Sequence, residues 1–242
     1  MLTIKELHKK TLPEHKKAAV KIDVVSYYLW RPICDFCSII LMNKISATAV
    51  TIISFYACII SLGFFTFMKG ITGALLGYLF LWIWNIADGI DGNIARYTGT
   101  CSKRGDLWDA VAGYAAMIVF YLGMGLVAAH ENSIIILNSI SSEAYVLMGA
   151  IAAICMIFPR LVTQKKQSVY GSDSTKSFKN KESYGIIKKI ALNVTSINGL
   201  AGFLFLIAIW MKMTNVLTIV YFIIMVLFGM ASLYTVMRDL ER

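Results

Sequence analysis

Long apolar segments separated by short polar ones dominate the pattern of this chain. Six of them reach about 20 residues, the length that a helix needs to cross roughly 30 Å of hydrocarbon. They are residues 46–68, 71–95, 107–129, 144–163, 189–211 and 214–237. Backbone polar groups in lipid must be hydrogen-bonded within their own segment, so helices are predicted and strands are not. The pattern therefore predicts an all-α membrane protein with six transmembrane helices.

The part of the chain before the first span has a different pattern. Residues 1–20 are polar and rich in lysine, and we expect them to be mobile. Residues 22–43 are apolar but interrupted by polar residues, namely Asp23, Arg31 and Asp35, together with Pro32. This pattern is typical of an amphipathic helix that lies along a membrane surface. The first apolar run comes late and follows many charges, so no signal peptide is expected.

Composition and charge support this interpretation and add an orientation. Of the residues, 58% are hydrophobic and 15% charged, whereas a soluble domain is nearer half apolar and a quarter charged. With the N-terminus inside, all lysines and arginines except Lys69 and Lys212 fall on the cytoplasmic side. The positive-inside rule then predicts that both termini are cytoplasmic. The net charge of +9 is explained by topology and anionic lipid headgroups, so no nucleic-acid partner is expected.

We therefore divide the chain into two parts. Residues 1–43 are predicted to form a cytoplasmic tail and an interfacial amphipathic helix, and residues 44–242 a six-helix membrane domain. Basic residues at the cytoplasmic helix ends are explained mainly by topology. Among them Arg160, more than Arg31, Lys165 or Lys166, is a candidate for binding the phosphate of a lipid or polar acceptor.

Aspartates gather where the second predicted span ends and the third begins. Half of the eight aspartates lie there: Asp88, Asp91, Asp106 and Asp109. Carboxylates at the end of a membrane helix are costly unless they are paired or bind a metal, so they mark a functional site. Asp88 and Asp91 are three residues apart and share one helix face with Gly92 and Ala95.

The third predicted span carries a similar stripe of Gly105, Asp109 and Gly113 at a spacing of four. The link 97–104 is short, which makes the two helices antiparallel neighbours whose faces can meet. Carboxylate oxygens without His or Cys suit Mg²⁺ or Mn²⁺ better than zinc, and two such ions can stabilise the displacement of a pyrophosphate. The alternative is an acidic cluster paired with nearby cations, although only three are available: Arg96, Lys103 and Arg104.

The spacing of these residues resembles a known signature. The stretch D-G-I-D-G-N-I-A-R, followed after eight residues by G-D-L-W-D, resembles that of the CDP-alcohol phosphotransferase family. The family pattern is D-x2-D-G-x2-A-R, a spacer, and then G-x3-D-x3-D. The residues in register are Asp88, Asp91, Gly92, Ala95, Arg96, Gly105 and Asp109. The six predicted spans and the amphipathic lead-in also resemble this family, so the resemblance covers nearly the whole chain.

The resemblance implies an activity and a set of partners. Family members transfer a phospho-alcohol group from a CDP-alcohol to the hydroxyl of an acceptor and release CMP, in the synthesis of phospholipids or related glycoconjugates. It also implies a two-metal site with Mg²⁺ or Mn²⁺ at the cytoplasmic face, contact with membrane lipids and a homodimer. By position, the metal ligands would be Asp88, Asp91 and Asp109. The nucleotide site would comprise Asp88, Gly92, Ala95, Arg96 and Gly105.

The chain departs from the family pattern at its last aspartate, where it has Gly113. In the family this aspartate completes the metal site and is the usual candidate for the base that deprotonates the acceptor. Asp106 lies one turn from Asp109 on the cytoplasmic side, and we hypothesise that it acts with Asp109 in catalysis or in metal binding. The alternative is that Asp106 has no role in the site and is simply an exposed acid at the start of a helix, where the helix dipole favours it. A second departure is S-A-T-A-V-T at Ser46–Thr51, where members often have T-P-N-x-V-T.

Three functions are compatible with these features. The first is a metal-dependent transferase that uses a CDP-alcohol. The second, supported by Gly113, is a catalytically impaired family member that binds CDP-linked ligand and metal in a regulatory or assembly role. The third, an ion-coupled transporter, is disfavoured because the acids cluster at a membrane face and not at the midplane.

Overall fold

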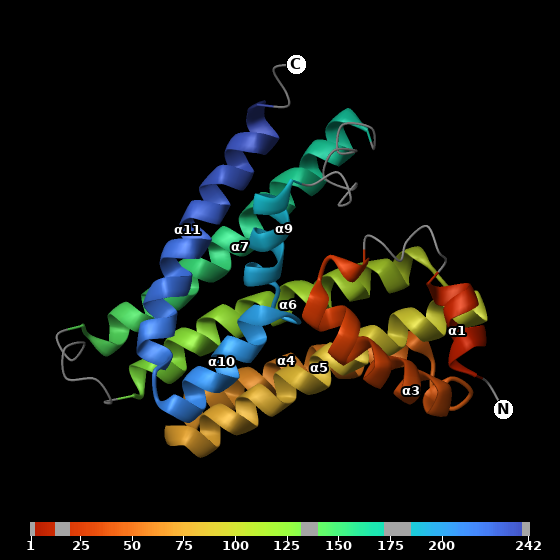
Figure 1. Ribbon diagram of the computed structural model, residues 1–242, viewed down its shortest axis with the longest axis horizontal. Helices are drawn as coiled ribbons and strands as arrows, with labels where there is room; N and C mark the ends of the chain where they lie inside the picture. Colours follow the sequence, from red (N-terminus) through yellow and green to blue (C-terminus); the bar gives the residue numbers. More distant parts are fainter. Residues whose placement is uncertain (1–2, 13–19, 132–139, 172–184, 239–242) are drawn as a thin grey trace. The chain divides into compact units, whose positions relative to one another are not determined.

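The computed structural model describes residues 3–12, 20–131, 140–171 and 185–238. Within these ranges the secondary structure is helical and contains no strand, which confirms the all-α class (Figure 1). Five helices are long and apolar enough to cross a membrane by length and composition. They are α4 (Ala47–Phe67), α5 (Gly70–Thr98), α6 (Lys103–Ala129), α7 (Ser142–Tyr170) and α11 (Thr214–Arg238).

A sixth span arises only if two bent helices are taken together. The helix predicted over residues 189–211 is divided into α9 (Ile186–Thr195) and α10 (Leu200–Met211), with a bend of 42° at the break. The Asn193 amide donates to the Ile22 carbonyl over 2.6 Å and accepts from the Val24 N–H over 3.1 Å. The Ser196 hydroxyl donates to the Asp23 carboxylate. Asn and Ser side chains readily bond to groups outside the helix ladder, and these contacts tie the break to residues 22–24.

The N-terminal segment is more ordered than its composition indicates. Helix α1 (Ile4–Thr11) begins with a capping box in which Thr3 and Glu6 satisfy each other's backbone N–H groups. Leu7 is fully buried, and α1 contacts helix α3 (Arg31–Leu41). Residues 4–11 thus form a docked helix where the sequence predicts a mobile tail. A π-helical turn, η1 (Ser26–Trp30), runs directly into α3.

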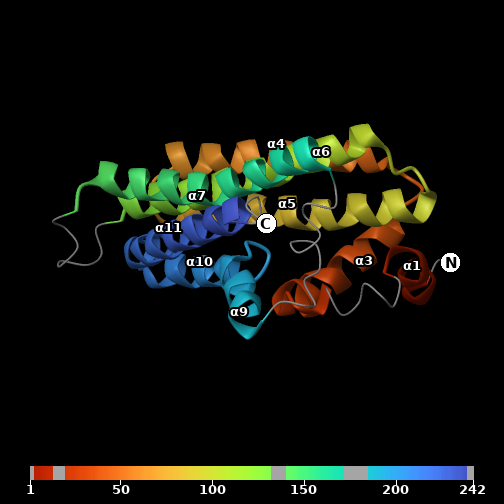
Figure 2. The ribbon, with the colours of Figure 1, turned by 90° about the horizontal axis from the view of Figure 1, so that it is seen from above.

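The chain forms two compact units. Unit 1 comprises the described parts of residues 1–61, 76–116 and 184–202, and it contains every residue of the aspartate motif. Its core behind the motif is made by apolar side chains of α3, α4 and α5. The core residues are Val50, Ala87, Ile90 and Ile94, packed against Cys37, Leu41, Ile45, Ala47 and Ile86. Figure 2 shows α3 alongside the end of α5 that carries the motif.

Unit 2 comprises the described parts of residues 62–75, 117–183 and 203–242. Helices α7 and α11 lie side by side in it (Figure 1), and a Cβ at Gly229 would come within 2.9 Å of the Cys155 carbonyl oxygen. Small residues permit such close helix contacts in membranes. The buried Lys166 ammonium donates to the Val236 carbonyl over 3.1 Å and thereby joins α7 and α11.

The contact between α3 and α5 depends on one glycine. A Cβ at Gly89 would lie 2.5 Å from the Cys34 sulfur, which itself is 3.7 Å from the Ile86 carbonyl oxygen. Burial, with some effect from neighbouring acidic groups, raises the pKa of the Cys34 thiol to about 12. Cys34 is therefore a neutral packing group that fills the space over Gly89.

Gly89→Ala is expected to destabilise unit 1 by about 1–3 kcal/mol, because the added methyl overpacks the α3–α5 contact. The measurement is the apparent melting temperature of the purified protein in detergent. Gly63→Ala is the matched control, since a Cβ at Gly63 meets nothing within 4 Å. Adding Cys34→Ala to Gly89→Ala should recover part of the loss. An unchanged melting temperature in Gly89→Ala would contradict this account of the contact.

Candidate metal and nucleotide site

The most firmly held carboxylate of the motif is Asp91 on α5. It is 4% exposed, and its Oδ2 accepts a hydrogen bond of 2.6 Å from the Thr51 hydroxyl on α4. The same hydroxyl lies 3.1 Å from the Ala47 carbonyl oxygen, but its single proton goes preferentially to the charged acceptor. Asp91 is thus oriented by a residue of the neighbouring helix.

Asp88 on α5 and Asp109 on α6 are the motif carboxylates that interact across the two helices. Asp88 is half-buried, and Asp109, near the start of α6, is exposed. The Asp88 carboxylate interacts electrostatically with Asp109 on α6 and with Asp91 on its own helix. The two helices therefore present three carboxylates to a common region of unit 1.

Arg96 covers the small residues of this face. A Cβ at Gly92 would lie 2.8 Å from Nη2 and 3.0 Å from Nη1 of Arg96, so the guanidinium folds back over the glycine. Its charge interacts with those of Asp91 and Asp109. The absence of a side chain at Gly92 gives Arg96 room to act as a counter-ion to the acids. Ala95, one turn further on the same face, is half-buried.

The start of α6 places Gly105 and Asp106 near the site. The Ser102 hydroxyl accepts the Gly105 N–H over 3.0 Å, and the Ser102 carbonyl accepts the Asp106 N–H over 3.0 Å. Asp106 is exposed in the first turn and interacts electrostatically with Asp109. A site role and a helix-dipole role are both compatible with this position.

Gly113 lies one turn further along α6 and borders open space. A Cβ built on Gly113 meets no atom within 4 Å. Packing therefore does not explain why this chain has glycine where the family pattern has aspartate, and a larger side chain fits there.

The donor atoms of this region suit a hard divalent cation. Asp88, Asp91 and Asp109 offer only carboxylate oxygens, which Mg²⁺ and Mn²⁺ prefer. In the described parts of the chain, no three His, Cys, Asp or Glu side chains lie close enough together to hold an ion as they stand. The residues thus fit such a metal in their chemistry, although their side chains have to approach one another to ligate it.

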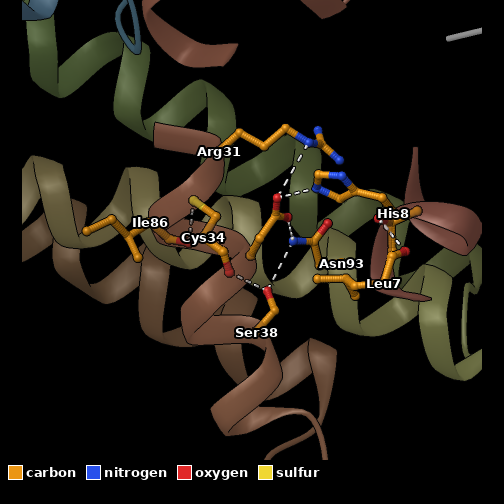
Figure 3. A network of polar contacts seen from close by, with 9 residues as sticks. Leu7, His8, Arg31, Cys34, Ser38, Ile86 and Asn93 are labelled. Atoms are coloured by element: carbon orange, nitrogen blue, oxygen red, sulfur yellow. Dashed lines mark hydrogen bonds and ion pairs between the residues drawn. The ribbon is translucent and has the colours of Figure 1, made fainter. Parts of the chain in front are cut away.

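A second polar network lies behind the motif, and sequence reasoning missed it (Figure 3). Asp35 on α3 is 1% exposed and accepts the Asn93 amide over 2.9 Å, while His8 Nε2 on α1 lies 2.5 Å from its other oxygen. The Asn93 amide also donates to the Ser38 hydroxyl over 3.1 Å. Asn93 belongs to the motif stretch, but at 100° per residue it points away from Asp88. The network anchors the rear of α5.

Two sequence signals could have directed attention to these residues. Thr51 ends the S-A-T-A-V-T stretch, where the family also has threonine. Asn93 is an amide on a face of α5 that is otherwise apolar, and such a buried group needs partners. Neither signal identifies the partner of its residue. Asp91, the partner of Thr51, and Asp35, the partner of Asn93, are both far away in the sequence.

Comparison with known proteins identifies the family of the chain. The chain belongs to the CDP-alcohol phosphatidyltransferase family, whose model matches residues 44–236, more than half of its length. The matched region contains α4 to α6 with all motif residues and extends into α11. A search among curated proteins finds no significant match.

Thr51→Val should lower the stability of unit 1, because it keeps the shape of the side chain and leaves the buried Asp91 carboxylate without this donor. A loss of about 1–3 kcal/mol is expected. Thr51→Ser, which retains the hydroxyl, is the matched control. Thermal unfolding of both variants in detergent tests the prediction, and equal melting temperatures for the two would refute it.

Proposed function

We propose that this protein is an integral membrane transferase that moves a phospho-alcohol group from a CDP-alcohol to an acceptor hydroxyl. In this reaction the acceptor oxygen attacks the phosphorus that carries the alcohol. The bond from that phosphorus to the oxygen of CMP breaks, and its electron pair leaves with CMP. The hydroxyl proton passes to a base, and a phosphodiester is formed. Phospholipids or related glycoconjugates are the corresponding products.

The observation that carries this proposal is the family match over residues 44–236, which contains the motif carboxylates Asp88, Asp91 and Asp109 on two helices of unit 1. The excess of negative charge in this region favours a bound cation. We assign Asp88, Asp91 and Asp109 as ligands of Mg²⁺ or Mn²⁺, which when bound would neutralise the diphosphate and stabilise its displacement. Thr51 would keep Asp91 in a ligating orientation.

The nucleotide is proposed to lie on the small residues Gly92, Ala95 and Gly105. For it to do so, the Arg96 guanidinium has to move from Gly92 toward solvent, where its charge can still meet the phosphates. The charge asymmetry of the chain supports a cytoplasmic position for this site and for both termini. A homodimer remains part of the proposal by family resemblance.

Gly113 supports a second candidate function. A family member without the last aspartate can retain metal and CDP-linked ligand and act in regulation or assembly. The transferase is favoured because metal electrostatics and positioning are usually the larger share of catalysis in phosphoryl transfer. Asp106 is our candidate for the base, as the remaining carboxylate one turn from Asp109.

Asp88→Asn and Asp109→Asn are each expected to reduce CMP release by at least about a hundredfold, the scale on which single electrostatic groups act on a transition state. The measurement is CMP release from a panel of CDP-alcohols by purified protein with Mg²⁺ or Mn²⁺. Glu143→Gln, which removes an exposed acid at the start of α7, is the control. If the wild type releases no CMP from any donor but binds CDP, the binding role is correct and the transferase is not.

Gly113→Asp is expected to accelerate turnover by about a hundredfold, the lower end of general-base assistance, because it supplies a carboxylate in open space near Asp109. Gly113→Asn fills the same space without a base and serves as control. Asp106→Ala should slow the wild type but have much less effect in Gly113→Asp. Wild-type activity in Asp106→Ala would exclude Asp106 as the base.

A further inference from the structure

Arg31 holds a buried hydrogen-bonding edge without a partner. Its side chain is 17% exposed, and Nε and Nη2 are both buried. These two nitrogens point along the same edge of the guanidinium, the edge that binds a carboxylate or phosphate through two parallel hydrogen bonds. Among the residues that the structure describes, none accepts a hydrogen bond from either atom. Buried charged donors are rarely left unmatched, so this edge points to a ligand.

The nearest acid does not fill this edge because His8 already holds it. Arg31 Nε lies 3.9 Å from Asp35 Oδ2, which is too long for a hydrogen bond. The same oxygen lies 2.5 Å from His8 Nε2, and the other carboxylate oxygen accepts from Asn93. Figure 3 shows His8 and Arg31 converging on this one carboxylate from α1 and α3. His8 on the docked helix α1 thus takes the Asp35 oxygen that lies nearest to Arg31, and Arg31 keeps only an ion pair at 3.9 Å with it.

Arg31 also lies close to the end of α5 that carries the motif. Cys34, one turn after Arg31 on α3, packs against Gly89, the residue that follows Asp88 on α5. An anion held by Arg31 therefore lies beside the site described above.

We propose that Arg31 binds a phosphate group of the substrate, and that His8 keeps Arg31 available by occupying Asp35. The inference rests on the proposed function, and it names the phosphate either of the CDP-alcohol diphosphate or of a phosphorylated acceptor. Arg31 is a binding residue, and His8 is a positioning residue that acts through Asp35. Without His8, Asp35 pairs with Arg31 one helical turn away, and the phosphate loses its partner.

The test measures binding by the purified full-length protein in detergent with Mn²⁺. One arm titrates CDP, and the other titrates inorganic phosphate into protein saturated with CDP. Arg31→Gln should weaken binding at least about tenfold in the first arm if the phosphate belongs to the donor, and in the second arm if it belongs to the acceptor. Arg31→Lys should recover only part of the loss. Arg238→Gln, an exposed arginine at the end of α11, should have no effect.

The His8 variants separate this inference from a general loss of folding. His8→Ala should weaken binding in the same arm as Arg31→Gln. Adding Asp35→Asn should restore it, because the amide oxygen still accepts from Asn93 but no longer attracts Arg31. Equal binding by wild type and Arg31→Gln in both arms overturns the inference, as does failure of Asp35→Asn to rescue His8→Ala. Absence of CDP binding by the wild type would instead count against the proposed function.

Discussion

The buried carboxylate of Asp35 is the interaction on which the arrangement of unit 1 depends. An ionised carboxylate away from water is costly unless several donors meet it. Here the two hydrogen-bonding partners are His8 from α1 and Asn93 from α5, while Arg31 on α3 itself adds an ion pair at 3.9 Å. Because removing any one donor leaves the charge less compensated, the network ties the amphipathic lead-in to the helix that carries the motif.

On the opposite face of α5, the motif carboxylates are less well compensated than Asp35 is. Asp88 and Asp109 carry like charges, and Arg96 of the motif acts electrostatically to compensate them. A cation site requires ligands that are held in place and whose negative charge is not fully neutralised by neighbouring residues. The Asp35 network supplies the first condition from one face of α5, and the motif carboxylates supply the second on the other face. The Thr51 hydroxyl adds to the first condition by fixing Asp91 from α4.

Much of this fold follows from sequence because lipid leaves few alternatives. The apolar run lengths predict α4, α5, α6, α7 and α11 well, since a spanning segment must satisfy its own backbone. The spacing of the motif likewise predicts that Asp88 and Asp91 share a face. The bend after Thr195, the docking of α1 and the Asp35 network were not predicted. Each depends on partners distant in the chain, such as Asn193 with Ile22, and these leave no periodic trace.

Gly113 shows how one residue changes the balance between binding and turnover. In the family pattern this position carries a carboxylate that serves the metal site and the acceptor proton together. Here the position is open, so the space remains while the charge and the base are lost. General-base assistance typically contributes about 10²–10⁴ in rate, whereas electrostatic stabilisation of the displaced diphosphate is usually larger. The carboxylates that supply the larger share, Asp88, Asp91 and Asp109, are all retained, and slower transfer is therefore the expected consequence of the glycine.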